Sequence, residues 1–428
     1  QHQLPIVAAH LVVLNGSDAN PIDKPGLSSF TADMLPEGSQ HRSSTQVADD
    51  AAQIGASVRS FATGDNSVLS IRTLKPNADA AFDLLSDVAL HPKFEPAEIE
   101  RVRKTREADI LQIQDDPTQM AIGVLFKTIY GPGHPYGYRD EGTIEANRLL
   151  NRDDMLKMWQ TGYAPGNSAL VLAGDLTPAE ARRLAEKYFG DWKGATARRP
   201  PPAVAVKTTR GITIVDKPGA AQTFVLVGSL GVARSTPDYV PLEVMNNILG
   251  GLFSSRINSN LREEHGYTYG GFSFFLYRRG TGVFAAGGGI RSDATAAAVT
   301  EIFKEFDRIR TTPPSAEELK LSKGAFSHSL AGLFESSEQT ANTIGDLFTH
   351  DLPLDYYQKL PARIDAVGPE DVERMAQNYI HPEKSVVIGA GDRSKIEDGL
   401  KKLSLGSVEV RDYEGNPVAR APSTETLH

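Results

Sequence analysis

Two periods of apolar and polar positions alternate along the chain, which predicts strands interspersed with amphipathic helices. Short apolar or alternating runs, typical of strands, cover residues 4–14, 58–74, 223–230 and 269–290. Between these runs, apolar residues recur every three to four positions, which is the period of a helix with one buried face. We therefore expect an α+β fold in which helices pack on one face of mostly antiparallel sheets.

Residues 24–37 show the helical period clearly. Four apolar side chains would form one stripe, and Pro25 suits the first turn of a helix. The stripe consists of Leu27, Phe30, Met34 and Leu35. On this pattern alone, the segment is an amphipathic helix whose apolar face packs against a core.

The order of the predicted elements repeats after about 216 residues, and such a period is a strong indicator of architecture. Residues 151–175 and 368–392 both read as a helix, a short turn, a buried apolar strand and then Gly-Asp. Residues 80–104 and 297–323 both read as a helix, a turn with proline and an acidic helix start. The two halves are therefore predicted to be two copies of one α+β domain.

The length of 428 residues suggests two to four domains at a prior of ~150 residues each. Residues 195–210 contain three consecutive prolines and no helical period, as expected for an extended linker. We place the first domain at residues 1–194 and the second at residues 211–412. A polar tail at residues 413–428 would follow.

Composition narrows the functional classes. The chain is 40% hydrophobic and 23% charged, and its net charge of −9 argues against a dedicated nucleic-acid binder. The nearest approach to a basic cluster, Arg198-Arg199, falls in the predicted linker. No window approaches the ~18 uninterrupted apolar residues of a membrane span, so we expect neither nucleic acid nor membrane as a partner.

The chain has no cysteine, which excludes disulfides, thiolate metal sites and cysteine nucleophiles. Absence of cysteine is compatible with an oxidising compartment. The sequence begins at Gln1 and enters a strand-like run within a few residues, so we expect an upstream segment such as a signal peptide plus a first strand. The expected location is the periplasm, with the cytoplasm as the alternative.

Residues 26–38, GLSSFTADMLPEG, resemble the zinc-binding helix of the pitrilysin (insulinase-type) metallopeptidases without its metal ligands. In that family two histidines of a His-x-x-Glu-His motif bind zinc and the glutamate acts as general base. Here the histidine positions are Ser29 and Asp33, and the glutamate position is Ala32. At the third ligand's spacing, shortly before an Asp-Asp-Pro turn, stands Asp109. The surrounding frame is retained at Gly26, Leu27, Phe30, Met34, Leu35 and Gly38. The resemblance implies that this chain holds no catalytic zinc.

A second resemblance lies in residues 261–269, LREEHGYTY, where Arg262 and Tyr269 match an Arg/Tyr pair of the same family. In the active relatives this pair reaches across a chamber to zinc bound in the other half. An arginine fork can hold a peptide carbonyl, and a tyrosine hydroxyl can stabilise an oxyanion by roughly 3–4 kcal/mol. Without the resemblance, Arg262 would favour the end of a helix capped by Gly266, and Tyr269 would simply pack.

Other possible metal-binding or phosphate-binding sites have weaker support in the sequence. No two of the ten histidines lie closer than eight residues, which argues against a two-histidine zinc helix. Asp33 and Asp109 could bind a hard cation only weakly, even if the fold brings them together. The run Gly287–Gly289 lacks the Lys-Ser/Thr of a phosphate loop. Gly250-Gly251 lacks the long glycine-rich loop of the mitochondrial non-catalytic subunit, which favours a bacterial-type pair.

Residues 55–74 read as an edge strand. In active relatives the corresponding strand binds the substrate backbone by strand addition. An ordinary edge strand without a ligand explains the same pattern equally well.

The resemblance implies that this chain is the zinc-less subunit of a two-chain metallopeptidase that degrades unfolded peptides. It would form half of a clamshell, and Arg262 and Tyr269 would act in trans on substrate bound to zinc in the partner. The chain would be inactive alone, and zinc would reside in the partner subunit. Two alternatives stay open: a catalytically silent structural core-type subunit, and a peptide-binding homodimer.

Overall fold

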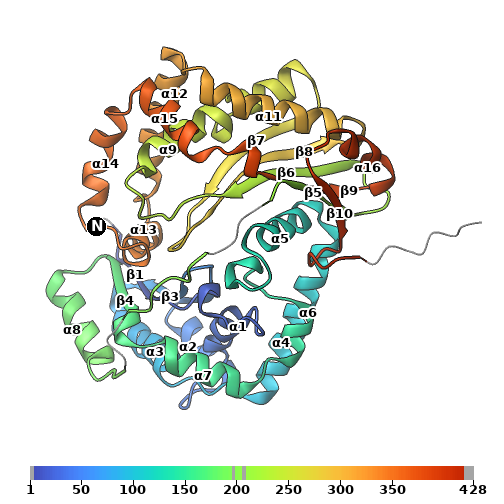
Figure 1. Cartoon of the computed structure of the whole chain (residues 1–428). Coiled ribbons are helices and arrows are strands. Elements are labelled where there is room, and N and C mark those ends of the chain that lie inside the picture. The colour runs from blue at the N-terminus through green and yellow to red at the C-terminus, as the bar shows by residue number, and fades with distance from the viewer. Residues whose placement is uncertain (1–3, 195–197, 205–208, 419–428) are drawn as a thin grey trace, which may run out of the picture.

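The structure is a computed structural model that describes residues 4–194, 198–204 and 209–418. It has two β-sheets, each with its own set of helices, one above the other in Figure 1. The predicted linker lies only partly within the described residues, and so does the predicted tail. Among the described residues, no helix is both long and apolar enough to cross a membrane.

The first sheet has four antiparallel strands in the order β2-β3-β1-β4. Its strands are β1 (Ile6–Val13), β2 (Ser57–Ala62), β3 (Ser67–Leu74) and β4 (Ser168–Gly174). Around it lie α1 (Leu27–Met34), α2 (Ser44–Gln53), α3 (Ala78–Leu90), α4 (Pro96–Gln112), α6 (Ile144–Leu149), α7 (Arg152–Gly162) and α8 (Pro178–Phe189). Apolar side chains of these helices and of β1 and β3 form one buried core.

The second sheet has six strands in the order β10-β5-β9-β6-β8-β7. They are β5 (Gly211–Asp216), β6 (Gln222–Leu230), β7 (Thr268–Leu276), β8 (Val283–Arg291), β9 (Val386–Gly391) and β10 (Ser407–Arg411). Pairing is antiparallel except along β10-β5-β9. Gly287 is required in β8, since a Cβ there would lie 1.8 Å from the Val225 carbonyl oxygen.

The helices of the second half are α9 (Tyr239–Asn246), α10 (Arg256–Asn258), α11 (Thr295–Thr311), α12 (Ala316–Gly332), α14 (Tyr356–Asp365), α15 (Pro369–Tyr379) and α16 (Arg393–Lys402). Two π-helical turns, η7 (Asn247–Gly251) and η8 (Ser259–Glu264), follow α9 and α10. The order of elements matches that of the first half, with β6 in the place of β1, the β7–β8 hairpin in the place of β2–β3, and α9 in the place of α1. The predicted repeat is therefore confirmed, and β5 and β10 are additions that it did not predict.

The two halves exchange one helix each. Helix α5 (Pro117–Tyr130), which follows α4, packs on β6 and β9 of the second sheet. Helix α13 (Ser337–Thr349), which follows α12, packs on β1 and β4 of the first sheet. Figure 1 shows α5 beneath the upper sheet and α13 beside β1. A helix from the other half thus covers part of the second face of each sheet, and the inner strands β1, β6 and β9 are buried along most of their length.

Buried charges join the halves where they meet. The Asp18 carboxylate, fully buried, lies 2.7 Å from Arg199 Nη2 and 3.2 Å from Arg279 Nη1. Asp65 accepts hydrogen bonds from the Tyr136 hydroxyl and from the Arg279 backbone N–H. Burial raises the pKa of Asp18 to about 6, although both guanidinium groups oppose that shift. Residue 199 of the predicted linker therefore fastens the two halves together.

Two local predictions are wrong. Residues 55–74 form a hairpin and not one strand, because the chain reverses between β2 and β3, where the Thr63 N–H donates to the Asn66 carbonyl. Helix α1 begins at Leu27, after Pro25 and Gly26, whose φ is +90°. It is also buried on nearly all sides, so its polar residues face protein and do not form a solvent face.

Candidate functional site

Ser29, Ala32 and Asp33, the positions that resemble a zinc motif, lie on α1 in the interior of the first half. Ser29 and Ala32 are buried, and Asp33 is partly buried. Helix α1 packs against α7, α4 and the β2–β3 hairpin, which fixes the direction of its side chains. At the three positions that resemble the zinc motif, α1 therefore carries the hydroxyl of Ser29, the methyl group of Ala32 and the carboxylate of Asp33.

Arg106 of α4 fills the space in front of these positions. Its Nη1 donates to Ser29 Oγ at 2.8 Å and also to the carboxylate of Asp33. Its Nη2 donates to the Glu141 carbonyl at 2.9 Å, and the guanidinium lies 4.9 Å from the centre of the Phe30 ring. Arg106 itself is buried. A permanent organic cation thus contacts both positions where the resemblance puts histidine ligands.

The acidic residues near this cation do not assemble a ligand set. Burial raises the pKa of Asp33, Arg106 opposes the shift, and the charges of Glu141 and Asp109 add to it. Asp109, one turn beyond Arg106 on α4, is exposed. Within the described ranges, neither Asp33 nor Asp109 belongs to a group of three metal-binding side chains. The guanidinium therefore balances the partly buried carboxylate of Asp33.

The second candidate site lies in the other half, on η8 and β7. The stretch that carries Arg262 is anchored by Arg256, whose guanidinium donates to Glu318 Oε1 at 2.7 Å and to the Thr312 carbonyl. The Arg262 guanidinium stacks 4.5 Å from the ring centre of Phe253, an aromatic residue that is 73% exposed. Arg262 is thus held near the surface between this exposed ring and the carboxylate of Glu263, which lies 3.4 Å from Arg262 Nε.

Tyr269 projects from an irregular part of β7. The pairing of β7 with β8 shifts between Thr268 and Gly271, which places Tyr269 in a bulge. Its side chain is 89% exposed, whereas that of Tyr267 is partly buried and stacks on the His265 ring at 4.9 Å. Bulges commonly redirect side chains next to functional sites. The packing role that the local pattern allowed for Tyr269 does not fit this exposure.

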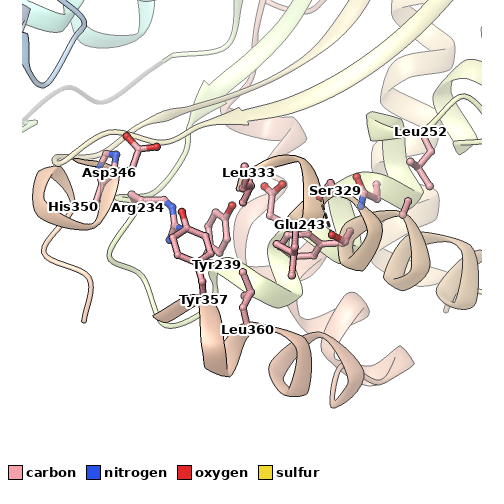
Figure 2. A pocket seen from close by; sticks show the side chains of 14 residues that line it. Arg234, Tyr239, Glu243, Leu252, Ser329, Leu333, Asp346, His350, Tyr357 and Leu360 are labelled. Carbon is pink, nitrogen blue, oxygen red and sulfur yellow. Dashed lines mark hydrogen bonds between the residues drawn. The ribbon is translucent and has the colours of Figure 1, made fainter. Parts of the chain in front are cut away.

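In the second half, α9 and α12 take the places of α1 and α4, and a pocket lies between them. A pocket of about 400 Å³ is bordered by α9, α12, α13 and α14, and Figure 2 shows polar side chains pointing into it. Arg234 stacks 3.4 Å from the Tyr239 ring centre, and the Tyr277 hydroxyl donates to Glu243 Oε1 at 2.7 Å. Burial raises the pKa of Glu243. Arg234 is the arginine that lines this pocket, and its charge opposes the raised pKa of Glu243.

The fold brings Arg262 and Tyr269 onto neighbouring elements, as their spacing suggested, since η8 packs against β7. It leaves α1 in the other half of the molecule (Figure 1). The sequence analysis missed two residues of these candidate sites, Arg106 and Phe253. Arg106 lies three residues before Asp109, so the helical spacing could have indicated a shared face. Phe253 gave no signal, because only its exposure makes it part of this surface.

Comparisons with known proteins agree with this architecture. Residues 1–134 match the family model described as Insulinase (Peptidase family M16), and residues 149–326 match the model described as Peptidase M16 inactive domain. Together the two models match more than half of the chain. A crystal structure titled peptidase M16 inactive domain, from Pseudomonas fluorescens, superposes with a TM-score of 0.86 at 24% identity, covering 92% of this chain and 94% of that one.

Relatives span nearly the whole chain. The uncharacterized zinc protease YmxG of Bacillus subtilis is 25% identical over 353 residues, which cover 82% of this chain and 84% of the relative. The mitochondrial-processing peptidase beta subunit of Lentinula edodes is 25% identical over 412 residues, which cover 90% of this chain and 84% of the relative. The family models, these relatives and the repeated α+β fold agree, and the chain therefore belongs to the insulinase-type (M16) peptidase family.

Proposed function

We propose that this chain is the zinc-less subunit of a heterodimeric zinc metallopeptidase that degrades unfolded peptides. The partner would hold the zinc and its general base. Arg262 would bind a substrate carbonyl, and the Tyr269 hydroxyl would donate to the oxyanion as water adds to the scissile bond. The chemistry would therefore need both subunits, and this chain alone would not cleave peptides.

The observation that carries the proposal is the contrast between the two halves. In the first half, Arg106 contacts Ser29 and Asp33, so the former zinc position already contains a cation. In the second half, Tyr269 is 89% exposed, and Arg262 stacks on the exposed ring of Phe253. A scaffold gains nothing from holding a tyrosine and a phenylalanine almost fully in solvent, whereas a substrate or partner surface does.

Both halves also offer an unpaired sheet edge. β2 and β7 each pair with one neighbour and form the outer strands of their sheets. An extended peptide can add to such an edge through its backbone, independently of sequence. The mitochondrial-processing peptidase relative is named as a subunit, which is consistent with a partner of the same family.

The test is hydrolysis of a quenched fluorescent peptide by the chain purified from its native cells together with its partner. We expect cleavage that a zinc chelator abolishes, and no cleavage by the recombinant chain alone. In the complex, Tyr269→Phe should lower kcat by about 10²–10³-fold, because one pre-positioned oxyanion donor is lost. Arg262→Ala should mainly raise KM.

Tyr267→Phe is the matched control, since this tyrosine lies two residues away but packs against the core. It should leave kcat unchanged. Full activity of the Tyr269→Phe complex would reject the role of the pair. Absence of cleavage by the native complex would favour the structural subunit, and peptide binding without cleavage would favour the peptide-binding homodimer.

We also propose a periplasmic location for the complex, which the cysteine-free composition permits. Fractionation of the native cells would test this directly. Recovery of the chain with cytoplasmic markers would contradict it.

A further inference from the structure

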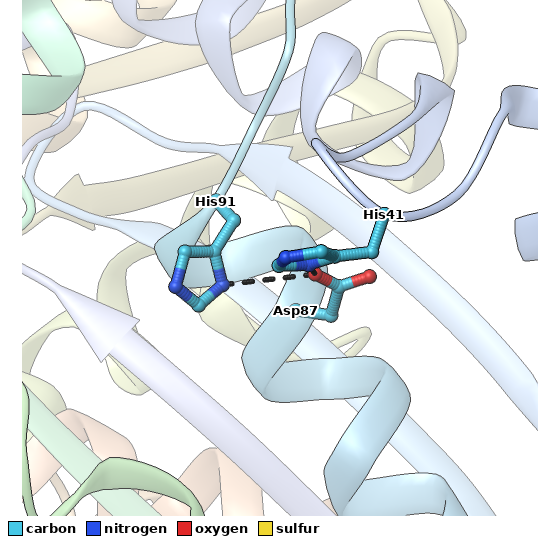
Figure 3. A group of neighbouring side chains, drawn as sticks. All are labelled: His41, Asp87 and His91. Carbon is cyan, nitrogen blue, oxygen red and sulfur yellow. Dashed lines mark hydrogen bonds and ion pairs between the residues drawn. The ribbon is translucent and has the colours of Figure 1, made fainter.

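Two histidines that are 50 positions apart in the sequence meet at one carboxylate on the first half. His41 lies in the loop after α1, whereas Asp87 and His91 lie at the end of α3, four residues apart. His41 Nδ1 is 2.6 Å from Asp87 Oδ1, and His91 Nδ1 is 3.6 Å from the same oxygen. Figure 3 shows both rings turned toward this carboxylate. Among the described residues, this is the one group of three such side chains whose ligand atoms lie within 4.8 Å of one another.

The second carboxylate oxygen is held by other groups. Ser39 Oγ donates to Asp87 Oδ2 at 2.6 Å, and Arg42 Nη1 donates to it at 2.7 Å. The carboxylate is buried, so these bonds fix its plane and direct Oδ1 toward the two imidazoles. Outer hydrogen bonds of this kind orient ligands in metal sites.

The loop that carries His41 is fastened to the helix end before any ion binds. The Gln40 N–H donates to the His91 carbonyl at 2.8 Å, and residues 39 and 92 form a β-bridge. Within the loop, the Ser39 hydroxyl accepts from the N–H groups of His41 and Arg42. The two imidazoles are therefore already positioned, and binding costs little ordering of the backbone.

Local charge favours a divalent cation. The Arg42 guanidinium donates to three carboxylates, those of Asp50, Asp83 and Asp87. With neutral imidazoles, three negative charges and one positive charge leave an excess of two negative charges. The imidazole rings are T-shaped, 5.1 Å apart, and partly exposed, so solvent can reach the space between them.

We propose that His41, Asp87 and His91 form a site for one divalent transition-metal ion such as Zn²⁺. Two imidazole nitrogens and one carboxylate oxygen suit the borderline-soft ions Zn²⁺, Co²⁺ and Ni²⁺, whereas Ca²⁺ and Mg²⁺ require more oxygen ligands. Water would complete the coordination. The ion would link the loop after α1 to the end of α3, at a place separate from Ser29, Ala32 and Asp33.

The experiment is calorimetric titration of the chelator-treated full chain with Zn²⁺, together with visible absorption of its Co²⁺ complex. We expect one equivalent to bind and the melting temperature to rise when Zn²⁺ is added. His41→Ala and His91→Ala should each weaken Zn²⁺ binding by about tenfold or more, because even outer-sphere changes have effects of that order. Ca²⁺ should not compete.

His328→Ala is the matched control, because this histidine is exposed on α12 in the other half. It should bind Zn²⁺ as the unaltered chain does. Comparing melting temperatures without metal shows whether each variant is folded. Undiminished Zn²⁺ binding by the folded His41→Ala/His91→Ala double variant, or no saturable binding by the unaltered chain, would overturn the proposal.

Discussion

At the scale of single residues, exposure distinguishes the two candidate sites. Arg106 is buried with its donors used by Ser29, Asp33 and a carbonyl, and its role is to balance charge inside the first half. Tyr269 projects into solvent from a bulged strand. A buried, hydrogen-bonded cation stabilises its surroundings, whereas an exposed aromatic hydroxyl is accessible to a ligand.

His350, at the end of α13, should make stability depend on pH. Burial, aided by four nearby arginines, lowers its pKa to about 3, and its Nδ1 has no hydrogen-bond partner. The unfolded chain takes up a proton below about pH 6.5 and the folded chain does not, so stability is lost as pH falls from 6.5 toward 3. The free energy of unfolding should fall between pH 7.5 and pH 5, and His350→Gln should make this fall smaller by about 1–2 kcal/mol.

Urea unfolding of both proteins at the two pH values measures this difference. His328→Gln, at an exposed position, should follow the unaltered chain. Parallel pH dependence of the His350→Gln variant and the unaltered chain would contradict the assignment.

At the scale of elements, the exchanged helices explain how two similar domains become one body. Leu125 of α5 is fully buried against the second sheet, where Gly228 of β6 leaves it room: a Cβ at Gly228 would lie 3.1 Å from Leu125 Cδ1. Helix α13 approaches β1 in the same way at Gly345, beside Val12. Small residues on one element therefore accept large side chains or close backbone contact from the other half.

Leu125→Ala should lower the free energy of unfolding by about 3 kcal/mol, because it removes buried methyl groups and leaves a cavity between the halves. Leu111→Ala on α4 is the control, since that leucine is exposed and its loss should have little effect. Equilibrium unfolding in urea compares them. Equal stability of the two variants would mean that α5 is not part of the cooperative core.

At the scale of the whole molecule, the halves are joined by charges as well as by helices. The Asp18 carboxylate of the first half contacts Arg279 of the second half and Arg199 between them. A buried carboxylate that loses its cation is costly, by about 3–5 kcal/mol in comparable pairs. This contact is one of those that hold the two halves together.

Arg279→Ala should therefore destabilise the chain by about 3 kcal/mol at pH 8. The effect should shrink at pH 5, because the pKa of Asp18 is about 6 and its carboxyl becomes neutral below that value. Thermal unfolding at both pH values measures the change. Arg291→Ala, which breaks only an exposed pair with Asp293, should leave stability unchanged. A cost that is independent of pH would contradict the role of Asp18.

Much of the architecture could be predicted from the sequence, because the periods of apolar residues and the repeat are local properties of the chain. Strands β4 and β9 and the helices before them follow directly from such patterns. The run at residues 269–290 is predicted as strand without its turn, and it forms the β7–β8 hairpin. Ser29, Ala32 and Asp33 and the Arg262/Tyr269 pair stay predictions that rest on the spacing of two motifs.

The tertiary structure decided what each of those positions touches. The placement of Arg106 against Ser29 and Asp33, the exposure of Tyr269 and the meeting of His41 with His91 all depend on residues distant in the sequence. Hydrophobic period reports which face of an element is buried but not which element covers it. Only the packed chain determines those long-range contacts, because they join residues that the local pattern cannot relate to one another.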